Sequence, residues 1–238
     1  MGKDVTAFRP GDEVFGSRSG TFAEYVSIPE DGVVLVKPAN LTFEQAASAG
    51  VAAFTALQAL RDKGHVRPGH KVLVNGAAGG VGTFAVQIAK AFGAEVTGVC
   101  STRNVEMVAK IGADQVIDYT QQEFTRAGQR YDLLVDAAGN RTLPECRRVL
   151  TPKGILVGVG DRPVIDLVKM LVLSSVVSQT MAPLFARQRK DDLAVLRELL
   201  EENNVIPVID RTYPLNEVPE AIRYLEHGHA RGKVVITV

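Results

Sequence analysis

The segment from Asn75 to Gly82 has residue types and a spacing that suit the binding of a diphosphate. Ala77, Gly79 and Gly82 follow the pattern G-x-G-x-x-G, with alanine in the first position. A tight turn needs a small residue first, the second glycine lets the backbone approach a pyrophosphate, and the third lets the next helix pack closely on the strand. The free N–H groups at the start of that helix would face the phosphates. The predicted contacts are Ala77, Ala78, Gly79, Gly80, Val81 and Gly82.

The residues after the next predicted strand indicate which dinucleotide is preferred. An acidic residue that holds the ribose 2′-OH of NAD is expected about 20 positions beyond the glycines. Residues 99–104 read VCSTRN and contain no carboxylate, and Glu95 lies at the other end of the strand. Ser101 and Arg103 can instead hydrogen-bond and neutralise a 2′-phosphate, although an arginine at a helix start is often only solvated. The sequence therefore favours NADP(H) over NAD(H).

The elements around this turn alternate in a way that predicts a parallel sheet. Val72–Val74 is a continuous apolar run, as expected of a strand that is covered on both faces. Strands that alternate with helices at this spacing form right-handed βαβ units. We therefore expect an α/β fold with a doubly wound parallel sheet, in which strands are predicted at 72–74, 96–100, 115–118, 133–135, 155–159 and 167–177, and helices at 81–92, 103–111, 143–150 and 191–202.

The two ends of the chain differ from this core. Residues 1–40 read as short strands between turns, and Thr42 with Gln45 predicts a capping box at the start of a helix that runs to about Leu60. Residues 205–238 return to short strands around one helix. The expected units are residues 1–48, a dinucleotide-binding domain at 49–204, and residues 205–238.

Composition excludes several classes of protein. Lys and Arg number 27, as do Asp and Glu, so the chain lacks the positive field on which many nucleic-acid binders rely. The longest uncharged stretch, Met170 to Ala186, contains several polar residues and is shorter than the roughly 20 apolar residues of a spanning helix. Cys100 and Cys146 are the only cysteines in the sequence. The first residues contain no apolar segment typical of a secretory signal. We therefore expect a cytoplasmic protein with a small-molecule substrate that binds neither nucleic acid nor membrane.

No metal site is expected. His227 and His229 form an H-x-H pair without an obvious third ligand, and two cysteines supply too few thiolates for a structural zinc site. Cys146 has no histidine near it in sequence, so it is interpreted as a helix-face residue rather than a nucleophile.

Several motifs together resemble one known family. The glycine segment, Val116–Tyr119 (VIDY) and Gly232–Ile236 (GKVVI) are similar to medium-chain dehydrogenase/reductases, in the zinc-free quinone oxidoreductase branch that includes zeta-crystallin. Arg9–Val14 (RPGDEV) and Gly20–Val26 (GTFAEYV) match the end of that family's GroES-like domain. The resemblance covers essentially the whole chain.

This resemblance implies a fold and a site. Residues 49–204 would form an NADP(H)-binding Rossmann domain, and both chain ends would form an incomplete GroES-like β-rich domain. Two copies would pair through the edge strand of the Rossmann sheet, which suits the apolar run at 171–177. The cofactor contacts that the resemblance adds to the glycine segment are Thr55, Ser101, Arg103, Asn104, Tyr119, Asp136, Gly139, Gly158 and Lys233.

The resemblance also implies a departure from the family. Its members carry a long stretch before the Gly2–Val5 (GKDV) motif, and this sequence starts there, at a Met1 where relatives often have valine. Much of the substrate pocket would lie in that stretch, so no catalytic residue is assigned. The resemblance implies NADPH-dependent, zinc-independent reduction of a quinone or an α,β-unsaturated carbonyl, which the short start would impair. The alternatives are a non-catalytic, crystallin-like nucleotide-binding protein and a fragment of a zinc-type alcohol dehydrogenase.

Overall fold

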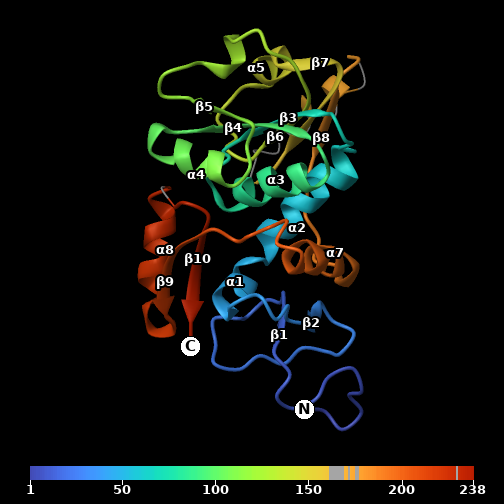
Figure 1. Cartoon of the computed structure of the whole chain (residues 1–238), viewed down its shortest axis with the longest axis vertical. Coiled ribbons are helices and arrows are strands. Elements are labelled where there is room, and N and C mark those ends of the chain that lie inside the picture. Colours follow the sequence, from blue (N-terminus) through green and yellow to red (C-terminus); the bar gives the residue numbers. More distant parts are fainter. Residues whose placement is uncertain (161–168, 171, 175–176, 229) are drawn as a thin grey trace.

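A parallel sheet of six strands forms the larger part of the molecule (Figure 1). The computed structural model describes residues 1–160, 169–170, 172–174, 177–228 and 230–238. The strand order is β5-β4-β3-β6-β7-β8, and every neighbouring pair is parallel. The strands are β3 (Lys71–Asn75), β4 (Glu95–Cys100), β5 (Gln115–Asp118), β6 (Tyr131–Asp136), β7 (Leu150–Gly158) and β8 (Thr180–Pro183).

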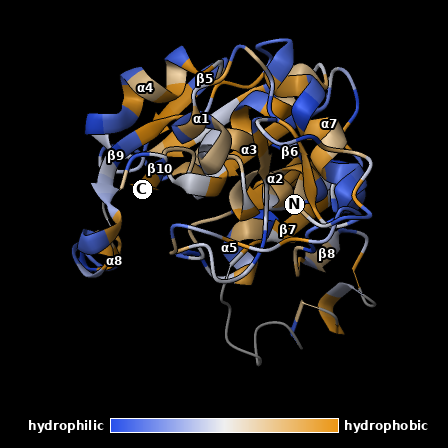
Figure 2. Cartoon of the chain, turned by 90° about the horizontal axis from the view of Figure 1, so that it is seen from below, coloured by the Kyte–Doolittle hydropathy of each residue, from blue (hydrophilic) through white to orange (hydrophobic). Residues whose placement is uncertain are grey.

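Helices cover both faces of this sheet, which explains the apolar runs of its central strands. Val72 and Val74 of β3 belong to one buried cluster, and Leu73 between them belongs to a second cluster on the opposite face. All three side chains are fully buried. Figure 2 shows hydrophobic residues along β6, β7, α2 and α3. The predicted doubly wound α/β fold is confirmed, with α3 (Gly80–Ala91), α4 (Val105–Lys110), α5 (Leu143–Arg148) and the 3₁₀ turns Thr102–Asn104 and Phe124–Arg126 connecting the strands.

The strand order changes direction at β3. The chain continues from β3 to β4 on one side, and then crosses to β6 on the other side of β3. Where two successive connections leave a strand toward opposite sides, they separate at the carboxyl end of that strand and leave a crevice between them. Open α/β sheets bind their ligands in this crevice. The glycine segment follows β3 directly, so the topology places it at the crevice.

The helix predicted from Thr42 to about Leu60 is interrupted. Its capping box is present, since Gln45 N donates to Thr42 Oγ1 at 3.2 Å and Thr42 N donates to Gln45 Oε1 at 3.0 Å. Gly50 has a ψ of −131°, outside the helical region, and separates α1 (Phe43–Ser48) from α2 (Val51–Gln58). A π-helical turn at Ala59–Lys63 follows. Small side chains allow α2 to be buried on all sides from Ala52 to Gln58.

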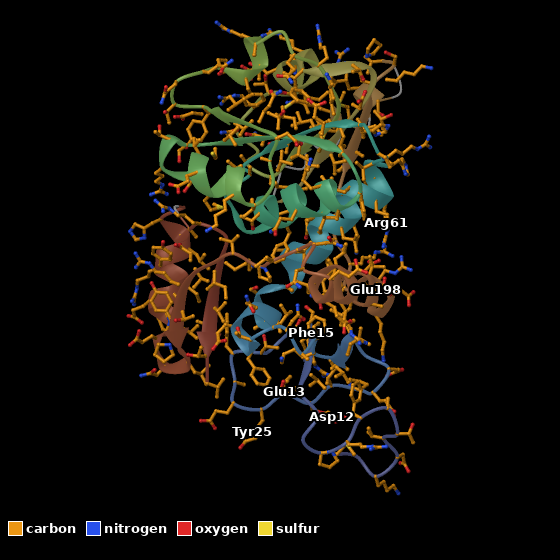
Figure 3. All side chains as sticks on the ribbon, viewed as in Figure 1. Asp12, Glu13, Phe15, Tyr25, Arg61 and Glu198 are labelled. Carbon is orange, nitrogen blue, oxygen red and sulfur yellow. The ribbon has the colours of Figure 1, made fainter. Side chains whose placement is uncertain are left out.

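The two chain ends lie on the same side of the larger sheet (Figure 1). β1 (Val14–Gly16) pairs with β2 (Val34–Val36), and β9 (Ile209–Pro214) pairs with β10 (Lys233–Thr237). Helix α1 packs against β1, β9 and β10, while α7 (Lys190–Glu201) packs against α2 and β2. The 3₁₀ turn Leu215–Glu217 and α8 (Val218–Glu226) connect β9 to β10. Phe15 is buried here, whereas Tyr25 is 89% exposed (Figure 3).

The edge of the sheet differs from the sequence prediction. We expected a strand at 167–177, but residues 169–170 and 172–174 are helical, and the edge strand is β8 at Thr180–Pro183. Residues 167–168, 171 and 175–176 of that prediction lie outside the described residues. Among the helices that the structure describes, none has the length and apolar character needed to cross a membrane.

Candidate functional site

The turn between β3 and α3 is built from glycines with different tasks. Gly76 has a φ of +85°, in the left-handed region that side chains disfavour, so it provides the reversal after β3. A Cβ on Gly82 would lie 2.0 Å from the carbonyl oxygen of Gly76, so the helix start can approach the turn only without a side chain there. This agrees with the close-packing role predicted for the third glycine.

Gly79 is different because it faces open space. A Cβ built on Gly79 meets only Gly76 O, at 3.5 Å, which is ordinary van der Waals contact. Gly79 caps α3, and the first N–H groups of a helix have no intrahelical acceptor. The turn therefore presents unpaired amides and a bare backbone to a cavity, which is the arrangement that a diphosphate requires.

Two lobes of one cleft meet at Gly76, Gly79 and Ala137. The first, which we call the ribose lobe, has a volume of about 640 Å³. The second, the lysine lobe, has a volume of about 360 Å³. The ribose lobe is lined by Asn75, Gly76, Ala78, Gly79, Val99, Cys100, Ser101, Thr102, Arg103, Asn104, Tyr119, Ala137, Ala138, Asn140, Gly228 and Ala230. The lysine lobe is lined by Val51, Ala52, Gly76, Gly79, Gly80, Val81, Gly82, Ala137 and Lys233.

Most of the predicted cofactor contacts therefore come together, from segments far apart in sequence. Five predicted residues lie outside both lobes: Thr55, Ala77, Asp136, Gly139 and Gly158. Thr55 is 7% exposed, and its hydroxyl donates to Val51 O at 2.7 Å within α2. Ala77 is fully buried beneath the turn, and Gly158 pairs in register with Asp136 inside the sheet.

Asp136 connects the two sides of the crevice by hydrogen bonds. It is fully buried, accepts from Asn75 Nδ2 at 2.8 Å and accepts from the N–H of Gly139 at 3.0 Å. Asn75 Nδ2 also donates to Asn140 Oδ1 at 3.0 Å. These bonds tie the end of β3 to the turn after β6, and they hold the two sides of the crevice at a fixed separation.

The ribose lobe is lined by donors, while its nearby carboxylate is already engaged. Asp118, at the end of β5, accepts from Thr102 Oγ1 at 2.6 Å and from Thr120 Oγ1 at 2.7 Å. These hydrogen bonds, that from Thr102 foremost, lower the pKa of Asp118, so it stays ionised. Asp118 does not line the lobe, and no described residue that does is acidic. Asn104, which lines the ribose lobe, has a buried Oδ1 atom without a hydrogen-bond partner among the described residues.

A thiol forms part of the floor of the ribose lobe. Cys100 is 3% exposed at the end of β4. Burial, with a smaller contribution from the negative charge of Asp118, raises the pKa of Cys100 to about 11. The thiol is therefore neutral at physiological pH and is a poor nucleophile.

Lys233 gives the lysine lobe its charge. Its Nζ lies 3.7 Å and its Cδ 3.4 Å from the position of a Cβ built on Gly80, so the ammonium sits beside the first turn of α3. Burial lowers the pKa of Lys233, and no carboxylate pairs with it among the described residues. A partly buried cation next to a helix N-terminus fits an anion held between them.

Several lining residues were not predicted from the sequence. Gly76 joins the two lobes, and Thr102 connects the ribose lobe to Asp118. Gly228 and Ala230 reach the ribose lobe from the loop between α8 and β10. A glycine directly after an apolar strand was a visible signal for Gly76, whereas nothing local marks the last two. The described residues contain no group of three or more His, Cys, Asp or Glu side chains that could hold a metal ion.

Comparisons with known proteins identify the family of the chain. A family model described as zinc-binding dehydrogenase matches residues 111–236. A mouse NAD(P)H oxidoreductase, RTN4IP1, is 35% identical over 274 residues, covering 100% of this chain and 67% of the mouse protein. A tomato 2-methylene-furan-3-one reductase is 33% identical, covering 99% of this chain and 60% of the tomato protein. The structure of the quinone oxidoreductase from Coxiella burnetii superposes with a TM-score of 0.89 at 32% identity, covering 100% of this chain and 75% of that one.

These comparisons correct one expectation. The cytoplasmic location predicted from the cysteine count and the missing signal is contradicted, because the similar mouse, bovine and human proteins are named as mitochondrial. Another relative is named as a chloroplast envelope protein. A low cysteine count reports only on redox conditions, and reducing conditions are not confined to the cytoplasm.

Proposed function

Because the chain belongs to the quinone oxidoreductase branch of the medium-chain dehydrogenase/reductase superfamily, we propose that it is an NADPH-dependent reductase of a quinone or an α,β-unsaturated carbonyl. The relatives named above reduce such compounds or use NAD(P)H, by their names. The observation that carries the proposal is the cleft itself, in which the glycine turn and the ammonium of Lys233 line the same lobe of about 360 Å³.

Each part of the cleft has a task in this proposal. The amides at the start of α3 and the Lys233 ammonium hold the diphosphate. Val51 and Ala52, at the start of α2, give the lysine lobe an apolar wall. The nicotinamide supplies the hydride when it is bound, so the protein is required chiefly to bind, orient and desolvate. No residue of this chain is assigned a proton-transfer role.

The preference for NADPH is supported by the ribose lobe. Ser101 and Arg103 offer one hydroxyl and one guanidinium at the end of β4, which suits a 2′-phosphate. The one carboxylate close by, Asp118, is engaged by Thr102 and Thr120 and does not line the lobe. A ribose 2′-OH would therefore find no carboxylate acceptor there, whereas a 2′-phosphate would find donors.

Steady-state kinetics test the proposal. We expect NADPH oxidation with at least one acceptor from a panel of quinones, enones and aldehydes, and a kcat/KM for NADPH well above that for NADH. Calorimetry with both nucleotides separates binding from turnover. Tight binding without turnover on any acceptor would establish instead the non-catalytic, crystallin-like alternative. Absence of binding to either nucleotide would refute both.

The unit formed by the chain ends also belongs to this proposal. We propose that residues 1–48 and 205–238 make one β-rich, GroES-like unit beside a cofactor domain at 49–204. Its support is that α1 packs against β1 from one end and against β9 and β10 from the other. Limited proteolysis should cut between the two units before it cuts within either one.

Dimerisation through the sheet edge is a further part of the proposal. The edge strand is β8, and its Met181 N–H already donates to Ser174 Oγ at 3.2 Å. Met181 N–H is therefore not available to a partner strand. Light scattering on the purified protein should give the mass of a dimer, and the mass of a monomer would refute this part of the proposal.

A further inference from the structure

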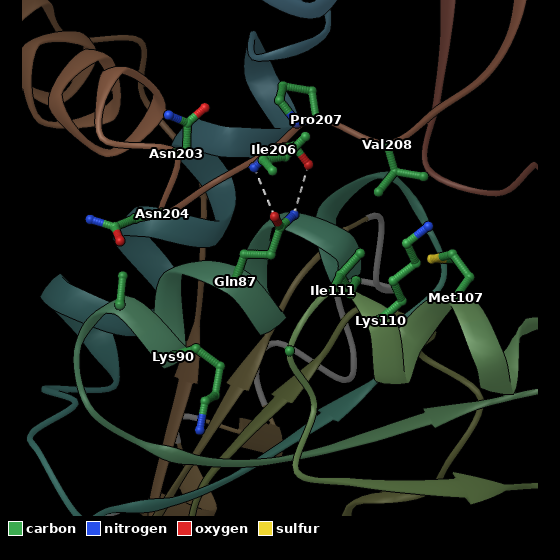
Figure 4. Close-up of a pocket in the computed structure, with 12 residues that line it drawn as sticks. Gln87, Lys90, Met107, Lys110, Ile111, Asn203, Asn204, Ile206, Pro207 and Val208 are labelled. Atoms are coloured by element: carbon green, nitrogen blue, oxygen red, sulfur yellow. Dashed lines mark hydrogen bonds between the residues drawn. The ribbon is translucent and has the colours of Figure 1, made fainter.

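A buried glutamine on α3 holds the segment that leads from α7 to β9. Gln87 is 6% exposed; its Nε2 donates to Ile206 O at 3.1 Å, and Ile206 N donates to Gln87 Oε1 at 2.8 Å (Figure 4). The side-chain amide thus pairs with both polar groups of one backbone residue. Gln87 Nε2 also donates to Thr83 O at 3.0 Å, which fixes the side chain on its own helix.

A second glutamine makes the same arrangement on the other side of α7. Gln58 of α2 is 5% exposed; its Nε2 donates to Arg187 O at 2.6 Å, and Arg187 N donates to Gln58 Oε1 at 3.0 Å. Arg187 lies just before α7, and Ile206 lies just after it. The two glutamines therefore anchor the two segments that flank this helix.

The Gln87 contact leads on to the cofactor cleft. Two residues after Ile206, the carbonyl oxygen of Val208 accepts from Lys233 N at 2.8 Å. Gly232 N in turn donates to Ala78 O, in the glycine turn, at 2.9 Å. A Cβ on Gly232 would lie 2.3 Å from Val208 O, so Val208 and the residue before Lys233 are in tight contact.

We propose that Gln87 is a positioning residue that, by fixing Ile206 and so Val208, holds the Lys233 ammonium beside the first turn of α3. The inference rests on the proposed cofactor site. It adds that the helix whose N-terminus binds the diphosphate also positions, from its far half, the cation that completes the site. A lysine has many rotamers, and a fixed backbone lowers the entropy that ordering its ammonium costs on binding.

The surroundings of Gln87 make this role separable from folding. A cavity of about 610 Å³, lined by Gln87, Ile206 and Val208 among others, adjoins the contact (Figure 4). When the amide is removed, water from this cavity can satisfy the N–H and C=O of Ile206. The segment then loses its fixed position while its polar groups stay hydrogen-bonded, so the protein remains folded.

Matched variants test the proposal. Gln87→Met should weaken NADPH binding by about tenfold, whereas Gln58→Met should change it by less than about twofold. Gln58→Met removes the matching pair of backbone bonds and also the bond from Gln58 Nε2 to Asp192 Oδ2 at 2.7 Å, so it should lose at least as much thermal stability as Gln87→Met. Gln87→Asn, too short to reach Ile206 but still polar, replaces Gln87→Met if that variant does not fold. Equal effects of the two sites on NADPH affinity would overturn the inference.

A double-mutant cycle identifies the route. If Gln87 acts through Lys233, Gln87→Met should cost little further affinity in a Lys233→Met background; a full tenfold loss there overturns the proposal. Amide hydrogen exchange without cofactor gives an independent reading, since the N–H of Lys233 should exchange faster in Gln87→Met and not in Gln58→Met. Faster exchange in a protein that binds neither nucleotide would refute the proposed function and leave the positioning intact. Unchanged exchange would refute the positioning itself.

Discussion

Substitution by alanine should have different effects at two glycines of the same turn: Gly82→Ala should lower stability, and Gly79→Ala should lower NADPH affinity. In Gly82→Ala the new methyl group would lie 2.0 Å from Gly76 O and 2.8 Å from Ala77 Cα. Both are backbone atoms of a turn that closes β3, so the turn or α3 must move by roughly 1 Å to reach normal contact. Overpacking of this kind costs about 1–3 kcal/mol, and the upper end applies where backbone has to give.

Gly79→Ala places its methyl group in the cleft instead. The nearest protein atom would be Gly76 O at 3.5 Å, and Gly79 has a φ of −82°, which alanine adopts freely. Stability should therefore change by less than about 0.5 kcal/mol. The methyl group would occupy the surface that the diphosphate must approach, and losing one or two charge-assisted hydrogen bonds costs about 1.5–3 kcal/mol each, or about tenfold or more in affinity.

Thermal unfolding and calorimetry on the same preparations separate the two effects. Gly82→Ala should lower Tm by about 6–12 °C, from about 2–4 °C per kcal/mol for a chain of this size. Gly79→Ala should leave Tm within about 2 °C of the wild type and weaken NADPH binding at least about tenfold. Wild-type affinity in Gly79→Ala would refute the assignment of this turn to a diphosphate, and wild-type stability in Gly82→Ala would refute the close packing.

Three further predictions concern the charges around the cleft. Arg103→Ala should weaken NADPH much more than NADH; equal losses in calorimetric Kd would show that Arg103 does not contact the 2′-phosphate. Burial lowers the pKa of Lys233, so its ammonium loses its proton as pH rises through that lowered value, below the ordinary 10.5. Between that lowered pKa and 10.5, the unfolded chain binds more protons than the folded one, so the free energy of unfolding rises with pH while NADPH affinity falls. Lys233→Met should remove the pH dependence of the unfolding free energy, measured with urea, and that of NADPH affinity, measured by binding titration. Asp118→Asn removes an ionised carboxylate beside Thr102 and should raise the NADPH-to-NADH affinity ratio a few-fold in the same assay, and a fall in that ratio would show that Asp118 organises the lobe rather than repelling the phosphate.

The parts of the fold that local patterns specify were predictable. The apolar run Val72–Val74, the glycine turn and the Thr42–Gln45 capping box each depend on residues close in sequence, and each is present. The break at Gly50 was not expected, because alanine-rich sequence on both sides favours a continuous helix. The edge strand was displaced for a related reason, since a short apolar run does not distinguish strand from helix.

The missing parts of the site depend on contacts between distant segments. Asp118 reaches Thr102 because β4 and β5 are neighbours in the sheet, a fact that spacing along the chain does not contain. The contact of Gly232 with Val208 likewise arises only when β9 and β10 pair. Asp136 was expected at the cofactor because it ends a strand, yet that position also suits a carboxylate that ties two turns together. Sequence alone does not separate these two uses.

The reversal of strand order at β3 determines where a ligand binds, but it does not determine which ligand binds. The crevice exists because consecutive crossovers leave β3 in opposite directions, and no individual side chain creates it. In the proposed function, coenzyme choice depends instead on a short rim segment at residues 101–104, all of which lines the cleft without contributing to the buried strands. That rim can diverge between lineages, or be exchanged by an engineer, while the scaffold beneath it keeps its shape.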